Sequence, residues 1–105
     1  MKVRLTPEAR GKILDVLDGI LRENPFAARR YRDLIDSSLR RLGRFPGLGH
    51  LVPEFPGAPF KQFLVLPYRF FFFIDERNKT VWIVDVWHGA QIPAYPQLPD
   101  LGAEP

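Results

Sequence analysis

Residues 69–91 read RFFFFIDERNKTVWIVDVWHGAQ. The stretch contains two runs rich in aromatic and β-branched residues, separated by the polar residues 76–79. Two such runs around a short polar loop are typical of a β-hairpin, so we expect strands over residues 68–75 and 80–88. Arg69 lies near the start of this hairpin and His88 at its end. Their positions raise the question of whether they mark a functional site.

The register of this hairpin decides which residues share a face. Side chains alternate across a strand, so the four consecutive phenylalanines put two rings on each face. If residues 76–79 form the loop, Asp75 lies opposite Thr80 and Arg69 lies opposite Val86. His88 then lies diagonal to Arg69 on the same face, and a slip of one residue would reverse the face of every partner.

Both faces of the predicted hairpin are strongly apolar, and a pair of helices can cover only one of them. Several aromatic rings left bare on a domain of 105 residues would form an unusually large exposed patch. We therefore expect the preceding loop, the C-terminal segment or a partner to cover the second face, which lacks the helices.

Two helices are predicted ahead of the hairpin. Each begins with a capping residue followed by proline, Thr6-Pro7 for the first and Asn24-Pro25 for the second. Gly43 is a plausible C-terminal cap for the second helix. About two residues separate the helices, so we expect an antiparallel helix hairpin. The apolar residues that recur at helical spacing are Ala9, Ile13, Val16, Leu17 and Ile20 in the first helix and Ala27, Tyr31, Leu34, Ile35, Ser38 and Leu42 in the second.

Short strands are expected at residues 2–5 and 61–65, the latter after a proline- and glycine-rich loop over residues 43–60. The element order is therefore strand, helix, helix and three consecutive strands. This order predicts an α+β fold, β-α-α-β-β-β, with the helix hairpin packed on one face of a small, mainly antiparallel sheet. We expect a single domain over residues 1–92 and an extended or disordered, proline-spaced tail over residues 93–105.

The composition narrows the possible functions. There is no cysteine, and two histidines cannot build a metal site alone, so we expect no metal and no other cofactor. A net charge of +3 is a mild basic bias, which attracts phosphates and acidic partners alike. The N-terminus has no apolar signal-peptide core and no run is long enough for a membrane span, so we expect a cytoplasmic protein without a membrane partner.

Four pieces of the sequence together resemble one known family. They are NPFAARRYRDLIDSSLRRL, FPGLGHLVPEF, LPYRFFFF and VWIVDVWHGAQ, in this order. The chain is similar over residues 2 to about 92 to the RelE/ParE superfamily of toxins from bacterial type II toxin–antitoxin modules. The resemblance implies the same sheet and helix hairpin, and a cognate antitoxin that wraps the toxin with a helix or a strand.

The resemblance implies two different targets. RelE-type members cleave messenger RNA on the ribosome without a metal, whereas ParE-type members inhibit DNA gyrase and are not nucleases. The helix start NPFAARRYRDLI looks more like the ParE side, while the Tyr68-Arg69 pair with His88 is compatible with the nuclease side. A degenerate toxin that retains only antitoxin binding is a third possibility.

For a nuclease, we expect the catalytic residues to be Arg69, His88 and Lys61. Arg69 could hold the phosphate, His88 could transfer a proton, and Lys61 could add positive charge. Glu54 and Tyr95 are weaker candidates for proton transfer.

Each of these residues also has a plain structural interpretation. Arg69 could pair with Asp85 or a tail carboxylate, His88 could bond to backbone at a strand end, and Lys61 could simply be solvated. Gln91 replaces an arginine common among relatives, and Lys61 alone remains of the basic residues that nucleases carry on this strand. The arginines of the second helix form either a solvated face or a contact with antitoxin or nucleic acid.

Overall fold

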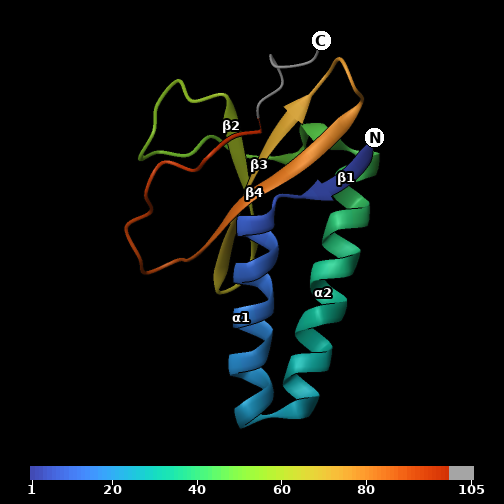
Figure 1. The fold of residues 1–105 in the computed structure, drawn as a ribbon, viewed down its shortest axis with the longest axis vertical. Coiled ribbons are helices and arrows are strands. Elements are labelled where there is room, and N and C mark those ends of the chain that lie inside the picture. The colour runs from blue at the N-terminus through green and yellow to red at the C-terminus, as the bar shows by residue number, and fades with distance from the viewer. Residues whose placement is uncertain (100–105) are drawn as a thin grey trace.

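The computed structural model describes residues 1–99. It contains one four-stranded sheet and one helix hairpin (Figure 1). The elements in chain order are β1 (Lys2–Leu5), α1 (Pro7–Glu23), α2 (Pro25–Arg44), the 3-10 turn η1 (Pro46–Leu48), β2 (Phe60–Val65), β3 (Tyr68–Asp75) and β4 (Thr80–His88). This order confirms the predicted β-α-α-β-β-β arrangement.

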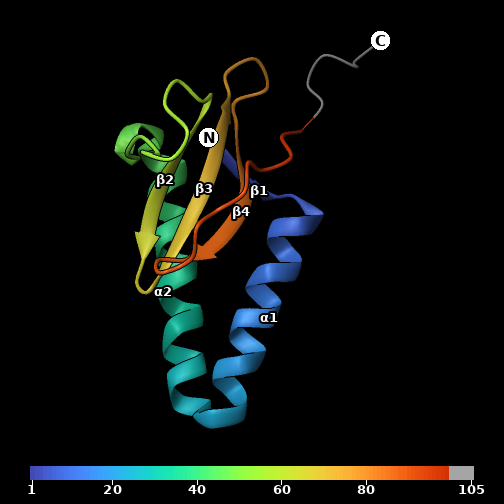
Figure 2. The ribbon, with the colours of Figure 1, turned by 90° about the vertical axis from the view of Figure 1, so that its left-hand side faces the viewer.

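The strands are ordered β1-β4-β3-β2 across the sheet. β1 pairs with β4 in parallel, whereas β2, β3 and β4 form the expected antiparallel meander. The two helices lie side by side and cover one face, with the tip of their hairpin extending beyond the ends of the strands (Figures 1 and 2). The sheet is therefore mainly antiparallel, with β2 as one of its two edge strands.

Both helices start where the sequence indicates. The Thr6 hydroxyl accepts a hydrogen bond from the backbone N–H of Ala9 at 3.2 Å, and the Asn24 side chain accepts one from Ala27 at 3.1 Å. Each side chain satisfies one of the N–H groups that a helix start leaves unpaired. The sequence thus predicted both N-termini correctly.

Two details of α2 differ from the expectation. Gly43 lies inside the helix, which ends at Arg44, so it is not the C-terminal cap. A Cβ at Gly43 would lie 2.8 Å from the carbonyl oxygen of Met1, so glycine allows β1 to approach the helix closely. Leu34 is 52% exposed and outside the buried stripe, because α2 turns Ala28, Tyr31 and Ile35 toward the core instead.

A β-bulge changes the predicted hairpin register. The expected register holds from Asp75–Thr80 to Phe72–Ile83, but Val84 is then an extra residue between two shifted parts of the ladder. Arg69 consequently pairs with Trp87, and Tyr68 pairs with His88. Because one inserted residue reverses the faces beyond it, Arg69 and His88 lie on opposite faces of the sheet. The prediction that they share a face was wrong.

Each face of the sheet carries its own apolar cluster. The helix-face core includes Phe70 and Phe72 of β3 packed with residues of α1 and α2. The second-face cluster includes Phe71 of β3 and Phe60 of β2. Around them lie residues of the loop before β2 and of the C-terminal segment, namely Val52, Phe55, Ala58 and Leu98. The four phenylalanines therefore point to both faces, as predicted, and the loop and C-terminal segment cover the second face.

Residues 93–99 have no regular secondary structure but pack on the protein. The ring of Tyr95 makes edge contacts with Phe55 and Phe60, at centroid distances of 5.2 and 5.0 Å. The rest of the predicted tail, residues 100–105, lies outside the described residues. Within residues 1–99, neither helix is both long and apolar enough to cross a membrane.

Candidate functional site

Arg69 is held in a buried ion pair on the second face. Its Nη1 and Nη2 donate to the two carboxylate oxygens of Glu54, at 2.8 and 2.7 Å, and its Nε donates to Oε1 of Gln62 at 2.7 Å. Arg69 is only 9% exposed. The guanidinium therefore already holds a bidentate anion, which is a side chain of the same protein.

Glu54 reaches Arg69 from the loop that covers the second-face cluster. The hydrogen bonds from Arg69 hold the pKa of the Glu54 carboxyl below its usual value. The carboxylate thus stays ionised at neutral pH and ties the loop to β3. This partner differs from the expected ones, which were Asp85 or a carboxylate of the tail.

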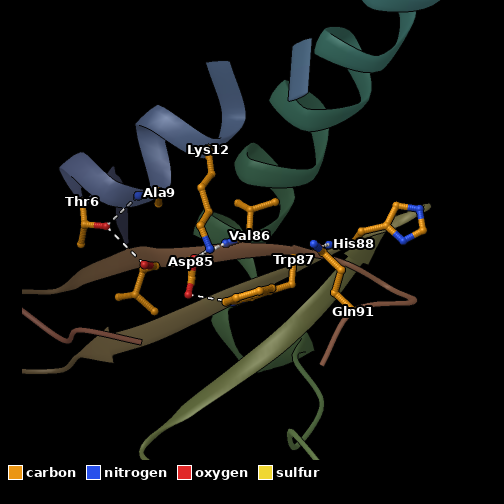
Figure 3. Close-up of polar contacts among 9 residues, drawn as sticks. Thr6, Ala9, Lys12, Asp85, Val86, Trp87, His88 and Gln91 are labelled. Carbon is orange, nitrogen blue, oxygen red and sulfur yellow. Dashed lines mark hydrogen bonds and ion pairs between the residues drawn. The ribbon is translucent and has the colours of Figure 1, made fainter. Parts of the chain in front are cut away.

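Asp85 instead belongs to a second network, which joins β4 to α1 (Figure 3). Its Oδ1 lies 2.7 Å from Nζ of Lys12, and its Oδ2 accepts a hydrogen bond from Nε1 of Trp87 at 2.8 Å. The Lys12 ammonium also lies 3.7 Å from the centroid of the Trp87 ring, a cation–π contact. These contacts satisfy a carboxylate next to the bulge that is only 7% exposed.

His88 bonds within the turn that follows β4. Its Nδ1 accepts a hydrogen bond from the backbone N–H of Ala90, and the backbone N–H of His88 donates to Oε1 of Gln91, both at 3.0 Å. The imidazole contacts the ring of Tyr68 edge-on at a centroid distance of 5.3 Å and points away from Asp85 in Figure 3. Gln91 stabilises this turn through that hydrogen bond.

Lys61 does not lie near either residue. It pairs with Phe72 in the sheet and so shares the helix face with His88, whereas Arg69 is on the second face. Val65, the strand partner of Tyr68, lies four positions after Lys61, which is about 13 Å along the strand. The structure therefore does not bring Arg69, His88 and Lys61 together.

The weaker candidates have structural contacts of their own. Glu54 is the partner of Arg69, and Tyr95 packs its ring on Phe55 and Phe60. His50 exchanges two backbone hydrogen bonds with Gln62, each 2.8 Å, at the outer edge of β2. Residues 1–99 contain no cluster of three His, Asp or Glu side chains arranged to hold a metal ion.

The sequence contains one feature that indicates the partner of Arg69. Glu54 is the only acidic residue between Asp36 and Asp75, in a stretch that also holds Arg69. A buried arginine needs an anionic partner, so a lone carboxylate in its own segment is a natural choice. Lys12 gave no comparable signal, because only the folded position of α1 brings it to Asp85.

Comparison with known proteins agrees with this fold. The family model described as ParE toxin of type II toxin–antitoxin system, parDE, matches residues 3–93. A chain in the crystal structure of the RelBE2 toxin–antitoxin complex from Mycobacterium tuberculosis is similar, with a TM-score of 0.61 and 23% identity. That match covers 86% of this chain and 92% of the other.

A search of curated proteins finds no match. The family match nevertheless spans nearly the whole described chain, and the similar structure has the same fold. The chain belongs to the ParE toxin family of type II toxin–antitoxin systems, within the RelE/ParE superfamily.

Proposed function

We propose that this toxin arrests growth by binding DNA gyrase, without catalysing a reaction, and that a cognate antitoxin neutralises it. The observation that carries the proposal is the placement of Arg69 and His88 on opposite faces of the sheet. The family match favours the same conclusion. Because gyrase acts in the cytoplasm, we place the action of the toxin there.

The alternative, cleavage of ribosome-bound messenger RNA, needs several groups to converge on one phosphate. A base, an acid and a cation must each lie within hydrogen-bonding reach of the reacting atoms. Here Arg69 bonds to Glu54 and Gln62, and Lys61 lies about 13 Å along the strand from the pair of Tyr68 and His88. Leaving Arg69 unpaired in its buried position would be strongly unfavourable.

An antitoxin partner is the second part of the proposal. The similar RelBE2 structure is a toxin–antitoxin complex, and toxins of this family belong to such modules. We therefore expect a short antitoxin gene directly beside the gene for this chain. Its product should bind the toxin and restore growth.

Growth assays with His88→Ala and Lys61→Ala test the absence of catalysis. Neither side chain is part of the buried Arg69 and Asp85 networks, so both variants should fold. We expect each variant to arrest growth as the wild type does, with induction of a DNA-damage reporter and intact ribosome-bound messages. Loss of toxicity in either variant, together with cut messages in cells making the wild type, would contradict the proposal. A wild type that never arrests growth would indicate a degenerate toxin.

A further inference from the structure

A group of arginines near the C-terminus of α2 lies beside several surface hollows. Arg40 and Arg44 line a hollow with the N-terminal residue Met1, and the same two line another with Arg41 and Phe45. Arg41 also lines a third hollow of about 330 Å³ between α2 and β2. We call Arg40, Arg41 and Arg44 with these hollows the arginine belt. In Figure 2 this half of α2 runs behind β2.

The arginine belt has a strong excess of positive charge. All three arginines are exposed, and the sequence from Ser37 to Pro53 contains no acidic residue. The ion pairs formed by residues 1–99 involve Lys12, Arg22 and Arg69, and none involves the belt. The nitrogen of Met1 donates to the carbonyl of Gly43 at 2.7 Å, which holds Met1 beside Arg40 and Arg44. Charge complementarity therefore favours an anionic partner.

Exposed apolar side chains accompany this charge. Phe45 is 58% exposed, Leu48 is 42% exposed and Leu64 is 53% exposed, and the two leucines line the hollow between α2 and β2. Aliphatic leucines do not stack on bases, but they do bury the apolar side chains of a protein segment. The exposed Phe45 could stack on a base, but Leu48 and Leu64 line the hollow between α2 and β2, so the combination favours an acidic, amphipathic protein segment over a nucleic acid.

We propose that the arginine belt binds an acidic, amphipathic segment of the antitoxin. An apolar side chain of this segment enters the hollow at Leu48 and Leu64, and its carboxylates pair with Arg40, Arg41 and Arg44. The inference rests on the proposed function only in assigning the segment to the antitoxin. The bound segment would lie at the β2 edge of the sheet, where Leu64 is the strand partner of Arg69.

Charge reversal tests the ionic half of this inference. Arg41→Glu with Arg44→Glu should weaken binding of the purified product of the adjacent antitoxin gene about 100-fold, measured by calorimetry on the full chain. The matched control is Arg10→Glu with Arg30→Glu, which changes the charge equally on exposed helix residues outside the hollows. We expect the control to change the affinity less than about threefold.

A pair of leucine variants tests the apolar half. Leu64→Ser should weaken antitoxin binding about tenfold, because a buried contact is lost. Leu34→Ser is the control, since Leu34 is 52% exposed, close to the 53% of Leu64, and lies outside the hollows of the belt. It should bind as the wild type does.

Arg41 and Arg44 also interact favourably with the negative C-terminal end of the α2 dipole, so reversing their charge could destabilise the helix. Thermal melting shows whether each variant is folded. If the charge-reversed chain does not fold, Arg41→Ala with Arg44→Ala replaces it, with an expected loss of about tenfold.

Wild-type affinity in the reversed and Leu64→Ser chains would overturn the inference and leave the proposed function intact. So would a reversal that spares the antitoxin but abolishes binding of a single-stranded RNA of about 20 nucleotides. No binding of the adjacent gene product to the wild type would overturn both the inference and the antitoxin partner of the proposed function.

Discussion

At the scale of single residues, carboxylates hold the irregular parts of this protein in place. Asp85 binds Lys12, the Trp87 indole and the backbone N–H of Val86, so both its oxygens are satisfied next to the bulge. Glu54 holds the loop over the second face in place, because both its carboxylate oxygens accept hydrogen bonds from Arg69 of β3. Leaving the buried Asp85 carboxylate or the buried Arg69 guanidinium without its partners would be strongly destabilising, so each network fixes one local conformation.

Replacing Asp85 by Asn should show this effect. The variant leaves the Lys12 ammonium without its counter-charge, and we expect the free energy of unfolding to fall by about 2 kcal/mol in urea titrations. Asp18→Asn is the matched control, because its pair with Arg22 is exposed and should matter by less than about 0.5 kcal/mol. Equal losses in the two variants would show that the Asp85 network does not stabilise the fold.

The Glu54 pair predicts a dependence of stability on pH. Because the folded-state pKa of Glu54 is lowered, its stabilisation is fully present above the unfolded-state pKa near 4.5 and is lost as the pH falls through the folded-state value. Glu54→Gln should therefore destabilise the protein at pH 7 by about 1 kcal/mol, a figure reduced for the partial exposure of Glu54. The difference from the wild type should shrink below pH 4.5 in urea titrations. A difference that stays constant down to pH 3 would contradict the assigned pair.

At the scale of elements, the sequence predicted what local chemistry decides. Thr6 and Asn24 reveal the helix starts because each caps a helix whose first residue is proline. The bulge at Val84 had no such local signal. Thr6, almost 80 residues away, binds this part of β4. Its backbone N–H donates to the carbonyl of Ile83 at 3.0 Å, and its hydroxyl donates to that of Val84 at 3.4 Å. Such long-range contacts were not visible in the sequence, so the two faces of the candidate site were assigned incorrectly.

Gly49 shows how tightly the loop before β2 packs on this sheet. A Cβ at Gly49 would lie 2.2 Å from Cζ of Phe72, whose ring is 1% exposed and has no room to move. Gly49→Ala should therefore lower the free energy of unfolding by about 1–3 kcal/mol, measured by urea titration. Gly47→Ala is the control, since no atom lies within 4 Å of its added Cβ. Wild-type stability in Gly49→Ala would show that the loop passes Phe72 at a greater distance.

At the scale of the whole molecule, both apolar faces of the sheet are covered within the chain. The helices cover one face, and the loop with residues 93–98 covers the other, so the fold needs no partner to bury Phe70, Phe71 and Phe72 of β3. The arginine belt is one exposed surface that remains for recognition. The proposed contacts with gyrase and with the antitoxin would both use such exposed surface.

The most direct test of this account is an assay of DNA gyrase with purified chain. We predict that the wild type and a His88→Ala, Lys61→Ala double variant inhibit supercoiling of relaxed plasmid equally, and that added antitoxin relieves both. The proposed action on gyrase would be contradicted if gyrase were unaffected while the wild type, but not the double variant, cut messenger RNA on purified ribosomes.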